Sequence, residues 1–141
     1  MKLSAIVLAI LLAVACGSSS SPTAPTRTAM PYDGNWSGQT AQAQAISFNV
    51  ASNAIHSLAF QFTASAPCNV VGGVVSGNTV VGAIANDGFT INGGDGPASW
   101  TLTGSFSSGT MGGGTLTVTL TNPTSICSTV VQTTWTAQKM P

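Results

Sequence analysis

The sequence predicts an all-β protein, either an antiparallel β-sandwich or a small closed β-barrel of about 8–9 strands. Apolar and polar residues alternate with a period of two in most segments after residue 30. Turn residues recur roughly every 8–12 positions, and no segment has the period of an amphipathic helix. We find no internal repeat and expect a single β domain, residues 31–141.

The first strands of this domain are expected to form a hairpin. Residues 31–34 read as a turn that leads into a strand at about 35–42. Two alternating segments, residues 46–50 and 58–63, then flank a tight turn at 52–53. Each segment keeps its large apolar side chains on one face, so both strands should bury that face.

The middle of the domain is richer in glycine. A valine-rich strand, residues 70–75, holds two adjacent glycines at its centre, which indicates a bulge or a close approach of another group to the backbone. Shorter strands are expected at 79–84 and 89–91, each preceded by an Asn- and Gly-containing turn. Residues 92–97 read as a loop.

The last strands are expected at residues 100–106, 115–121 and about 125–137, with a Gly/Ser-rich loop between the first two. Trp100 and Trp135 are in phase with the apolar residues of their strands. This alternation predicts that both indoles lie inside the domain.

The composition is unusual for its scarcity of charge. Only 4% of the residues are charged, and the acidic ones are Asp33, Asp87 and Asp95. With Lys+Arg at 3, no basic patch is available, so we expect no nucleic-acid partner. Hydrophobic residues make up 43% of the chain, which argues against disorder.

The N-terminal segment reads as a sorting signal. Lys2 is followed by an apolar run, residues 3–15, that a single serine interrupts. A membrane-spanning helix needs about 20 apolar residues, so this run is too short to stay as one. It fits the apolar core of a signal peptide, and small residues lead directly to Cys16. Residues 17–30 are rich in Ser, Pro and Thr and read as a flexible tether.

This N-terminus resembles the lipobox of bacterial lipoproteins, with Ala13 at a position where Leu is usual. The resemblance implies that residues 1–15 are removed and that Cys16 receives the lipid, with residues 16–30 as lipidated cysteine and tether. It places the protein in the bacterial cell envelope, held to a membrane through acyl chains, and Gly17 favours the outer membrane. An ordinary secretory signal is the alternative.

The two remaining cysteines, Cys68 and Cys127, are expected to form a disulfide. Export would place them in an oxidising compartment, where an even pair normally closes. Neither a Cys-x-x-Cys pattern nor a zinc-ligand spacing is present, so a redox or metal site has little support.

Catalytic residues are not indicated. Each aspartate sits beside a glycine, as turn aspartates do, and His56 has no neighbouring nucleophile in a recognised pattern. A single glycine-rich segment at 92–96 is insufficient for a calcium-binding repeat. We therefore expect no enzyme activity, no metal and no cofactor.

Gly34-Asn35-Trp36 resembles the Gly-x-Trp start of calycins, the lipocalin and avidin-like barrels that hold small ligands. In that family the Trp closes one end of the barrel against a late Arg, whereas here Lys139 is the only cation near the C-terminus. The resemblance makes Trp36 a candidate ligand-binding residue. Trp100 and Trp135 are further candidates, because an exposed indole could stack against a sugar.

Our functional expectation is a lipid-anchored, non-catalytic surface or interaction module. The chain also resembles short bacterial lipoproteins with a Gly-x-Trp-x-Gly, Cys, Cys, Trp pattern, here residues 34–38, Cys68, Cys127 and Trp135. The alternative is a calycin-like binder of a small apolar ligand, which requires empty space inside the domain. The candidate partners are an envelope protein, a glycan or such a ligand.

Overall fold

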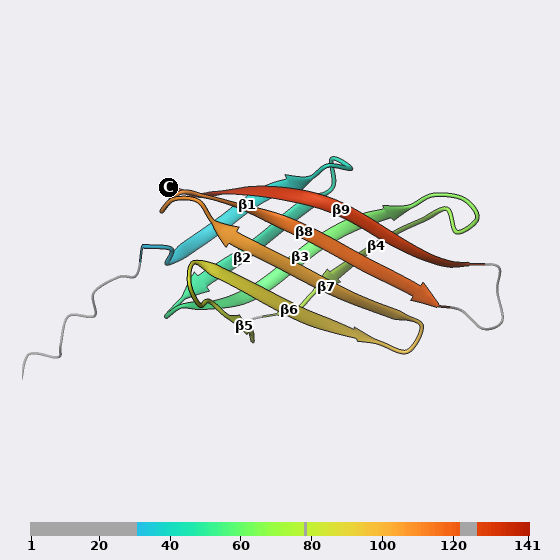
Figure 1. Cartoon of the computed structure of the whole chain (residues 1–141), viewed down its shortest axis with the longest axis horizontal. Helices are drawn as coiled ribbons and strands as arrows, with labels where there is room; N and C mark the ends of the chain where they lie inside the picture. The colour runs from blue at the N-terminus through green and yellow to red at the C-terminus, as the bar shows by residue number, and fades with distance from the viewer. Residues whose placement is uncertain (1–30, 78, 122–126) are drawn as a thin grey trace, which may run out of the picture.

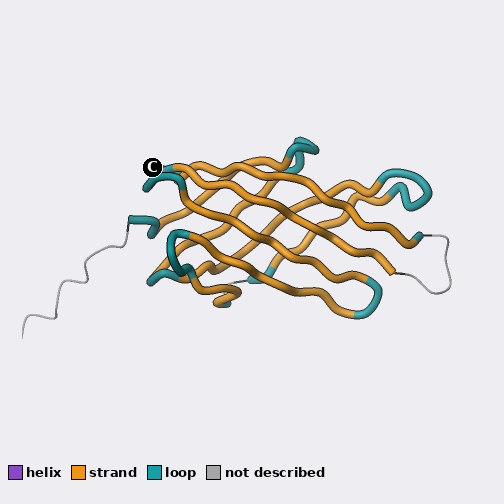
Figure 2. Tube along the Cα trace, viewed as in Figure 1, coloured by secondary structure: helices purple, strands orange, loops and turns teal. Residues whose placement is uncertain are grey.

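The structure, a computed structural model, describes residues 31–77, 79–121 and 127–141. Within these ranges every regular element is a β-strand, as Figure 2 shows. The all-β class predicted from the sequence is therefore confirmed. The signal peptide expected at residues 1–15, and Cys16 with the tether that follows, lie outside the described residues.

In the described part of the chain, nine antiparallel strands form one strongly curled sheet, a half-barrel. The hydrogen-bonded order is β4-β3-β2-β1-β9-β8-β7-β6, with β5 paired to β3 outside this path. In chain order the strands are β1 (Gly34–Thr40), β2 (Ala45–Ala51), β3 (Ala54–Ala64), β4 (Val70–Val75), β5 (Val80–Ala83), β6 (Gly88–Asp95), β7 (Ala98–Phe106), β8 (Met111–Thr121) and β9 (Ser128–Lys139). Strands β1 and β9 join the N-terminal and C-terminal halves of the sheet.

A seam separates the two edges of this curled sheet. One edge is shared by β4 and β5, which pair with successive parts of β3: β4 with residues 59–64 and β5 with residues 54–56. The other edge is β6. Strand β5 lies close to β6, since a Cβ on Gly82 would come within 2.6 Å of the Ile91 side chain. The seam is thus narrow beside β5.

An aromatic cluster fills one part of the interior. Trp36 and Phe48 stack with their planes 8° apart, and Phe48 meets Trp135 edge-on at 82°. Phe89 and Phe106 complete the cluster, and all five side chains are buried. Aromatic contacts of this kind add to the hydrophobic gain from burial. The end of the domain where Trp36 lies is therefore packed.

Glycines at inward positions make room for these rings. A Cβ on Gly104 would contact the Trp135 indole and would lie 2.6 Å from Cζ of Phe89. Similarly, a Cβ on Gly72 would lie 2.6 Å from Cζ of Phe62. The paired glycines of β4 thus allow a close approach and not a bulge, because the β3–β4 register is regular from Ala59↔Val75 to Ala64↔Val70.

Turn residues and one side-chain amide complete the hairpins. Ser52 and Asn53 both have positive φ, 59° and 58°, as the tight turns favoured in hairpins require. The Gln42 amide, in the β1–β2 turn, donates to the Thr63 carbonyl at 2.7 Å and accepts from the Thr63 N–H at 3.0 Å. Gln42 therefore satisfies backbone groups of β3 beyond the N-terminal start of β2.

The structure corrects several expected boundaries. Residues 92–95 belong to β6, so only Gly96 and Pro97 turn the chain where a longer loop was expected. The Gly/Ser-rich segment 107–114 is a four-residue turn at 107–110 followed by the start of β8. These glycine-rich segments pair as strands because the missing side chains leave room for the neighbouring strand. A Cβ on Gly114, for example, would clash with the backbone of Thr103 on β7.

The Cys68–Cys127 disulfide predicted from the sequence is confirmed. It joins the β3–β4 connection to the residue just before β9. Because β3 and β9 are separated by β2 and β1 in the sheet order, the bond crosses the curl of the sheet. Among the described residues there is no helix long and apolar enough to cross a membrane.

Candidate binding site

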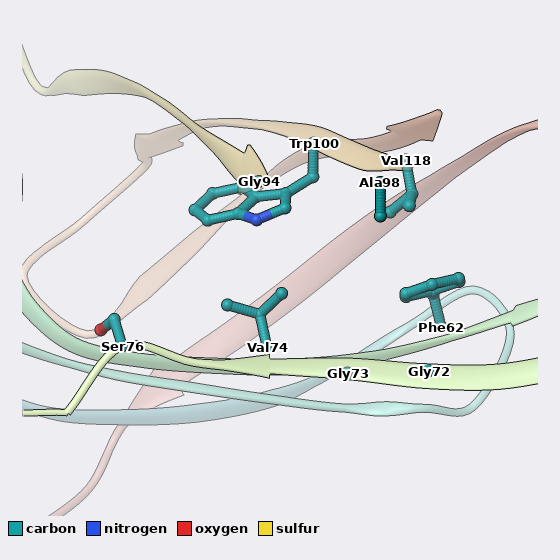
Figure 3. Close-up of a pocket in the computed structure, with 9 residues that line it drawn as sticks. All are labelled: Phe62, Gly72, Gly73, Val74, Ser76, Gly94, Ala98, Trp100 and Val118. Carbon is teal, nitrogen blue, oxygen red and sulfur yellow. The ribbon is translucent and has the colours of Figure 1, made fainter. Parts of the chain in front are cut away.

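A cleft of about 590 Å³ lies along the seam, where β4 faces β7 and β8 across the interior (Figure 3). Its walls come from five strands and from the residue that follows β4. The lining residues are Phe62 of β3, Gly72, Gly73 and Val74 of β4, Ser76, Gly94 of β6, Ala98 and Trp100 of β7, and Val118 of β8. The volume is within the range of small-molecule sites.

Trp100 forms one wall of this cleft. A Cβ on Gly93, its cross-strand neighbour, would run into the indole, so the glycine lets the ring lie against β6. The edge-on contact with Phe60 has a centroid separation of 5.2 Å and an interplanar angle of 76°. In Figure 3 the indole lies above Val74, and its nitrogen is on the side of the ring that faces the gap.

The three tryptophans differ in how their N–H groups are used. Trp36 donates to the Tyr32 carbonyl at 2.9 Å, and Trp135 donates to the Thr103 carbonyl at 3.0 Å. Both indoles are almost completely buried, with 1% and 2% of their surface exposed. Trp100 is only partly buried, and its N–H meets no acceptor among the described residues. That N–H is a side-chain donor available to a ligand in the cleft.

The opposite wall is built by β3 and β4. Phe62 lies over Gly72, and Val74 points into the gap toward Trp100 (Figure 3). Small residues, Gly94 and Ala98, leave the space between the walls open. Hence the cleft has two large aromatic side chains, an aliphatic floor and little polar surface.

The electrostatics of the cleft follow from its lining. None of the described lining residues carries a charge, and Ser76 is the one hydroxyl among them; it donates to the Gly77 carbonyl at 3.4 Å. Lys139 contacts the Pro31 carbonyl at 3.4 Å and does not line the cleft. An uncharged, mostly apolar surface suits a neutral apolar molecule better than an ion.

The titratable groups serve other contacts. The Tyr32 hydroxyl donates to Asp87 at 2.7 Å, and this hydrogen bond, with smaller contributions from desolvation and the Asp87 charge, raises the pKa of Tyr32 above 10.0. Asp33 accepts from the Ser52 N–H at 3.1 Å, as a turn aspartate does. His56 is half-buried on β3. Within the described ranges, no three His, Cys, Asp or Glu side chains gather in a metal-binding group.

The structure separates the three tryptophans that the sequence put forward together. Trp36 and Trp135 lie in the aromatic cluster, whereas Trp100 lines the cleft. Sequence reasoning did not single out Phe62, Val74 or Val118 as lining residues. Gly72 and Gly93 were the sequence features that could have indicated the two cleft walls. Each is an inward-facing glycine that leaves room for an aromatic ring from the neighbouring strand.

Comparison of the chain with protein-family models, with curated proteins and with solved structures finds no match.

Proposed function

We propose that the protein is a lipid-anchored, non-catalytic binding module of the bacterial cell envelope that takes up a small, neutral, apolar ligand. The observation that carries this proposal is the uncharged seam cleft, with Trp100 on one wall and Phe62 on the other. Such concave, mostly apolar surfaces with few polar groups are typical of small-molecule sites.

The chemistry of the lining defines the ligand. The ring surfaces of Trp100 and Phe62 favour a flat or extended hydrocarbon between them. The unused indole N–H of Trp100 favours one hydrogen-bond acceptor on that molecule. A carboxylate or phosphate group gains no counter-charge from the lining residues, so neutral ligands are favoured over anionic ones.

The finer architecture, a closed barrel or a sandwich, is part of the same proposal. Closure is supported on the β5 side, where Gly82 lies against Ile91 of β6. On the β4 side the cleft separates the walls. A ligand placed there would complete the interior in the way that a bound molecule fills the mouth of a calycin barrel.

The binding test uses the full chain with Cys16→Ser, so that no acyl chain competes for the cleft. The neutral fluorophore N-phenyl-1-naphthylamine is the probe, and its emission is followed on titration with protein. Ala98→Trp fills the cleft and should weaken binding about tenfold or more, equivalent to about 1.4 kcal/mol. Ala45→Trp, on the exposed outer side of β2, is the matched control and should leave binding unchanged.

A second variant tests the hydrogen-bond donor. Trp100→Phe keeps an aromatic wall and removes the N–H, so it should weaken a ligand with an acceptor more than a pure hydrocarbon. Equal binding by wild-type and Ala98→Trp proteins would refute the cleft as the site, and so would a lack of probe binding by the wild type.

The anchor rests on the sequence of the N-terminal segment and is tested separately. Metabolic labelling of expressing bacteria with radioactive palmitate should tag the protein, and Cys16→Ser should abolish the tag. Membrane fractionation should then place the labelled protein with the outer membrane. Label that survives Cys16→Ser would rule out lipidation at this cysteine.

An interaction module is the second candidate function. Strand β4 favours it, because β4 ends the hydrogen-bonded order of the sheet and carries Val71 and Val75, two of the most exposed large apolar side chains. Edges of this kind accept additional strands.

A further inference from the structure

Strand β4 lacks the features with which natural edge strands avoid pairing. Such strands usually carry lysine, proline, inward charges or a bulge. The β4 sequence is Val-Val-Gly-Gly-Val-Val, and its register with β3 has no bulge. Val71 and Val75 are 68% and 81% exposed. An unprotected apolar edge in a protein with so few charges calls for a partner strand.

The direction of the β4 backbone groups follows from its pairing with β3. The Ser76 N–H donates to the Leu58 carbonyl at 2.8 Å, so even-numbered residues direct their backbone groups at β3. In agreement, the odd-numbered Thr63 of β3 directs its N–H to the other side, toward Gln42. Val71, Gly73 and Val75 therefore direct their N–H and C=O groups toward the other edge of β4, which pairs with none of the described strands.

A second copy of the chain fits this edge in one register. Two antiparallel strands related by a two-fold axis present the same face of the sheet, so directly opposed residues must both point outward or both inward. With the axis at Gly73, Val71 of each copy lies opposite Val75 of the other. The exposed valines then cover one another, and the three outward-directed residues exchange their backbone hydrogen bonds across the axis.

We propose that the protein forms a two-fold symmetric dimer through antiparallel β4–β4 pairing centred on Gly73. The backbone direction of β4 requires odd-numbered residues to lie opposite one another. Among such registers the exposed valines favour this one over a shift of two residues, which would set Val71 opposite Gly73 and leave Val75 without a valine partner. Interfaces built on one strand are small, so the dimer is expected to be reversible and concentration-dependent.

Pairing in this register also reaches the cleft. On the inward side Gly72 of one copy lies opposite Val74 of the other, and both positions line the cleft in the single chain. Each copy thus adds an aliphatic side chain to the β4 wall of its partner. The dimer does not require a bound ligand.

The test measures the sedimentation-derived mass of the full chain with Cys16→Ser over a series of concentrations. We expect the apparent mass to double as concentration rises. Val71→Lys/Val75→Lys places like charges opposite each other and should give a monomer at every concentration. Val130→Lys is the matched control. Val130 is likewise an exposed valine, at 62%, but it lies on β9, which is paired on both sides by β1 and β8.

A charge pair tests the register itself. Val71→Lys/Val75→Glu sets Lys opposite Glu twice across the axis, so the dimer should persist and should weaken as salt is added. A wild-type chain that stays monomeric at all concentrations overturns the proposal. A dimer that survives the double-lysine change, or a Lys/Glu variant that is as monomeric as the Lys/Lys variant, overturns it as well. Circular dichroism confirms that each variant keeps its strands.

Discussion

Removing the disulfide should cost the domain a large share of its stability. The perturbation is Cys68→Ala/Cys127→Ala, which opens a covalent loop of 59 residues. Closing a loop of this length reduces the chain entropy of the unfolded state by an amount worth about 4 kcal/mol at 25 °C. Single domains have roughly 5–15 kcal/mol of stability in total, so the variant is expected to remain folded but to be strongly weakened.

Urea denaturation followed by tryptophan fluorescence measures this loss. With an m-value of about 1–3 kcal/mol/M, a loss of 4 kcal/mol lowers the midpoint by roughly 1.3–4 M. The m-value should rise too, since the unfolded chain without the bond exposes more surface. Reduction of the wild-type protein should reproduce the shift. A change below about 1 kcal/mol would show that the unfolded chain is not restrained as the loop-entropy argument requires.

Three further changes test individual contacts. Tyr32 is the only tyrosine, so the absorbance of tyrosinate reports the titration of this one group. Because the pKa of Tyr32 is raised in the folded protein, its hydrogen bond to Asp87 contributes its full stability below pH 10.0. That contribution is lost as the pH rises through the folded-state pKa. Asp87→Asn should bring that pKa back toward 10.0, and an unchanged titration would disprove the role of the Asp87 hydrogen bond. Gly104→Ala should destabilise by about 1–3 kcal/mol in urea because its Cβ would meet Phe89 and Trp135, whereas Gly109→Ala, whose nearest contact is 3.4 Å away, should be close to neutral; equal effects would contradict the packing argument. Gln42→Ala should cost about 1–3 kcal/mol by leaving the Thr63 backbone unpaired. The exposed Gln39→Ala should stay within about 0.5 kcal/mol, and a similar loss at both positions would show that the Gln42 bonds are not the cause.

The strands and the disulfide were accessible from the sequence because local rules decide them. Alternation places Ile46, Phe48 and Val50 on one face, and all three are buried. The turn at Ser52 and Asn53 follows from residue types that tolerate positive φ. The cysteine pairing was predicted from the expectation that Cys16 is lipidated, which leaves one pair, and the structure joins Cys68 to Cys127.

The cleft was not accessible in the same way, because alternation reveals the face of a side chain and not the width of the space in front of it. Trp100 and Trp135 obey the same pattern, yet one lines the cleft and the other is enclosed by aromatic rings. The difference arises from the curl of the sheet, which brings β5 against β6 but leaves β4 apart from β7. Curl depends on many weak long-range contacts that no single segment records. The predicted boundaries of β6 and β8 were wrong for a related reason. Their glycines suggested loops, but in the structure they lie in strands and leave room for side chains and backbone of the neighbouring strand.

The scarcity of charge gives the seam its importance. An outer surface made of threonine, serine, asparagine and glutamine offers little electrostatic discrimination between partners, so recognition must come from shape, apolar contact or backbone pairing. The seam offers all three kinds of recognition. The aromatic cleft supplies shape and apolar contact, and the β4 backbone groups directed away from β3 can pair with another strand. The disulfide ties the β3–β4 connection to β9, and so it holds one end of the β4 wall in place. If the seam carries the function, loss of the disulfide should weaken probe binding by more than the loss of global stability explains. That comparison, made at temperatures where both forms are fully folded, separates a staple that only stabilises the domain from one that also shapes its binding site.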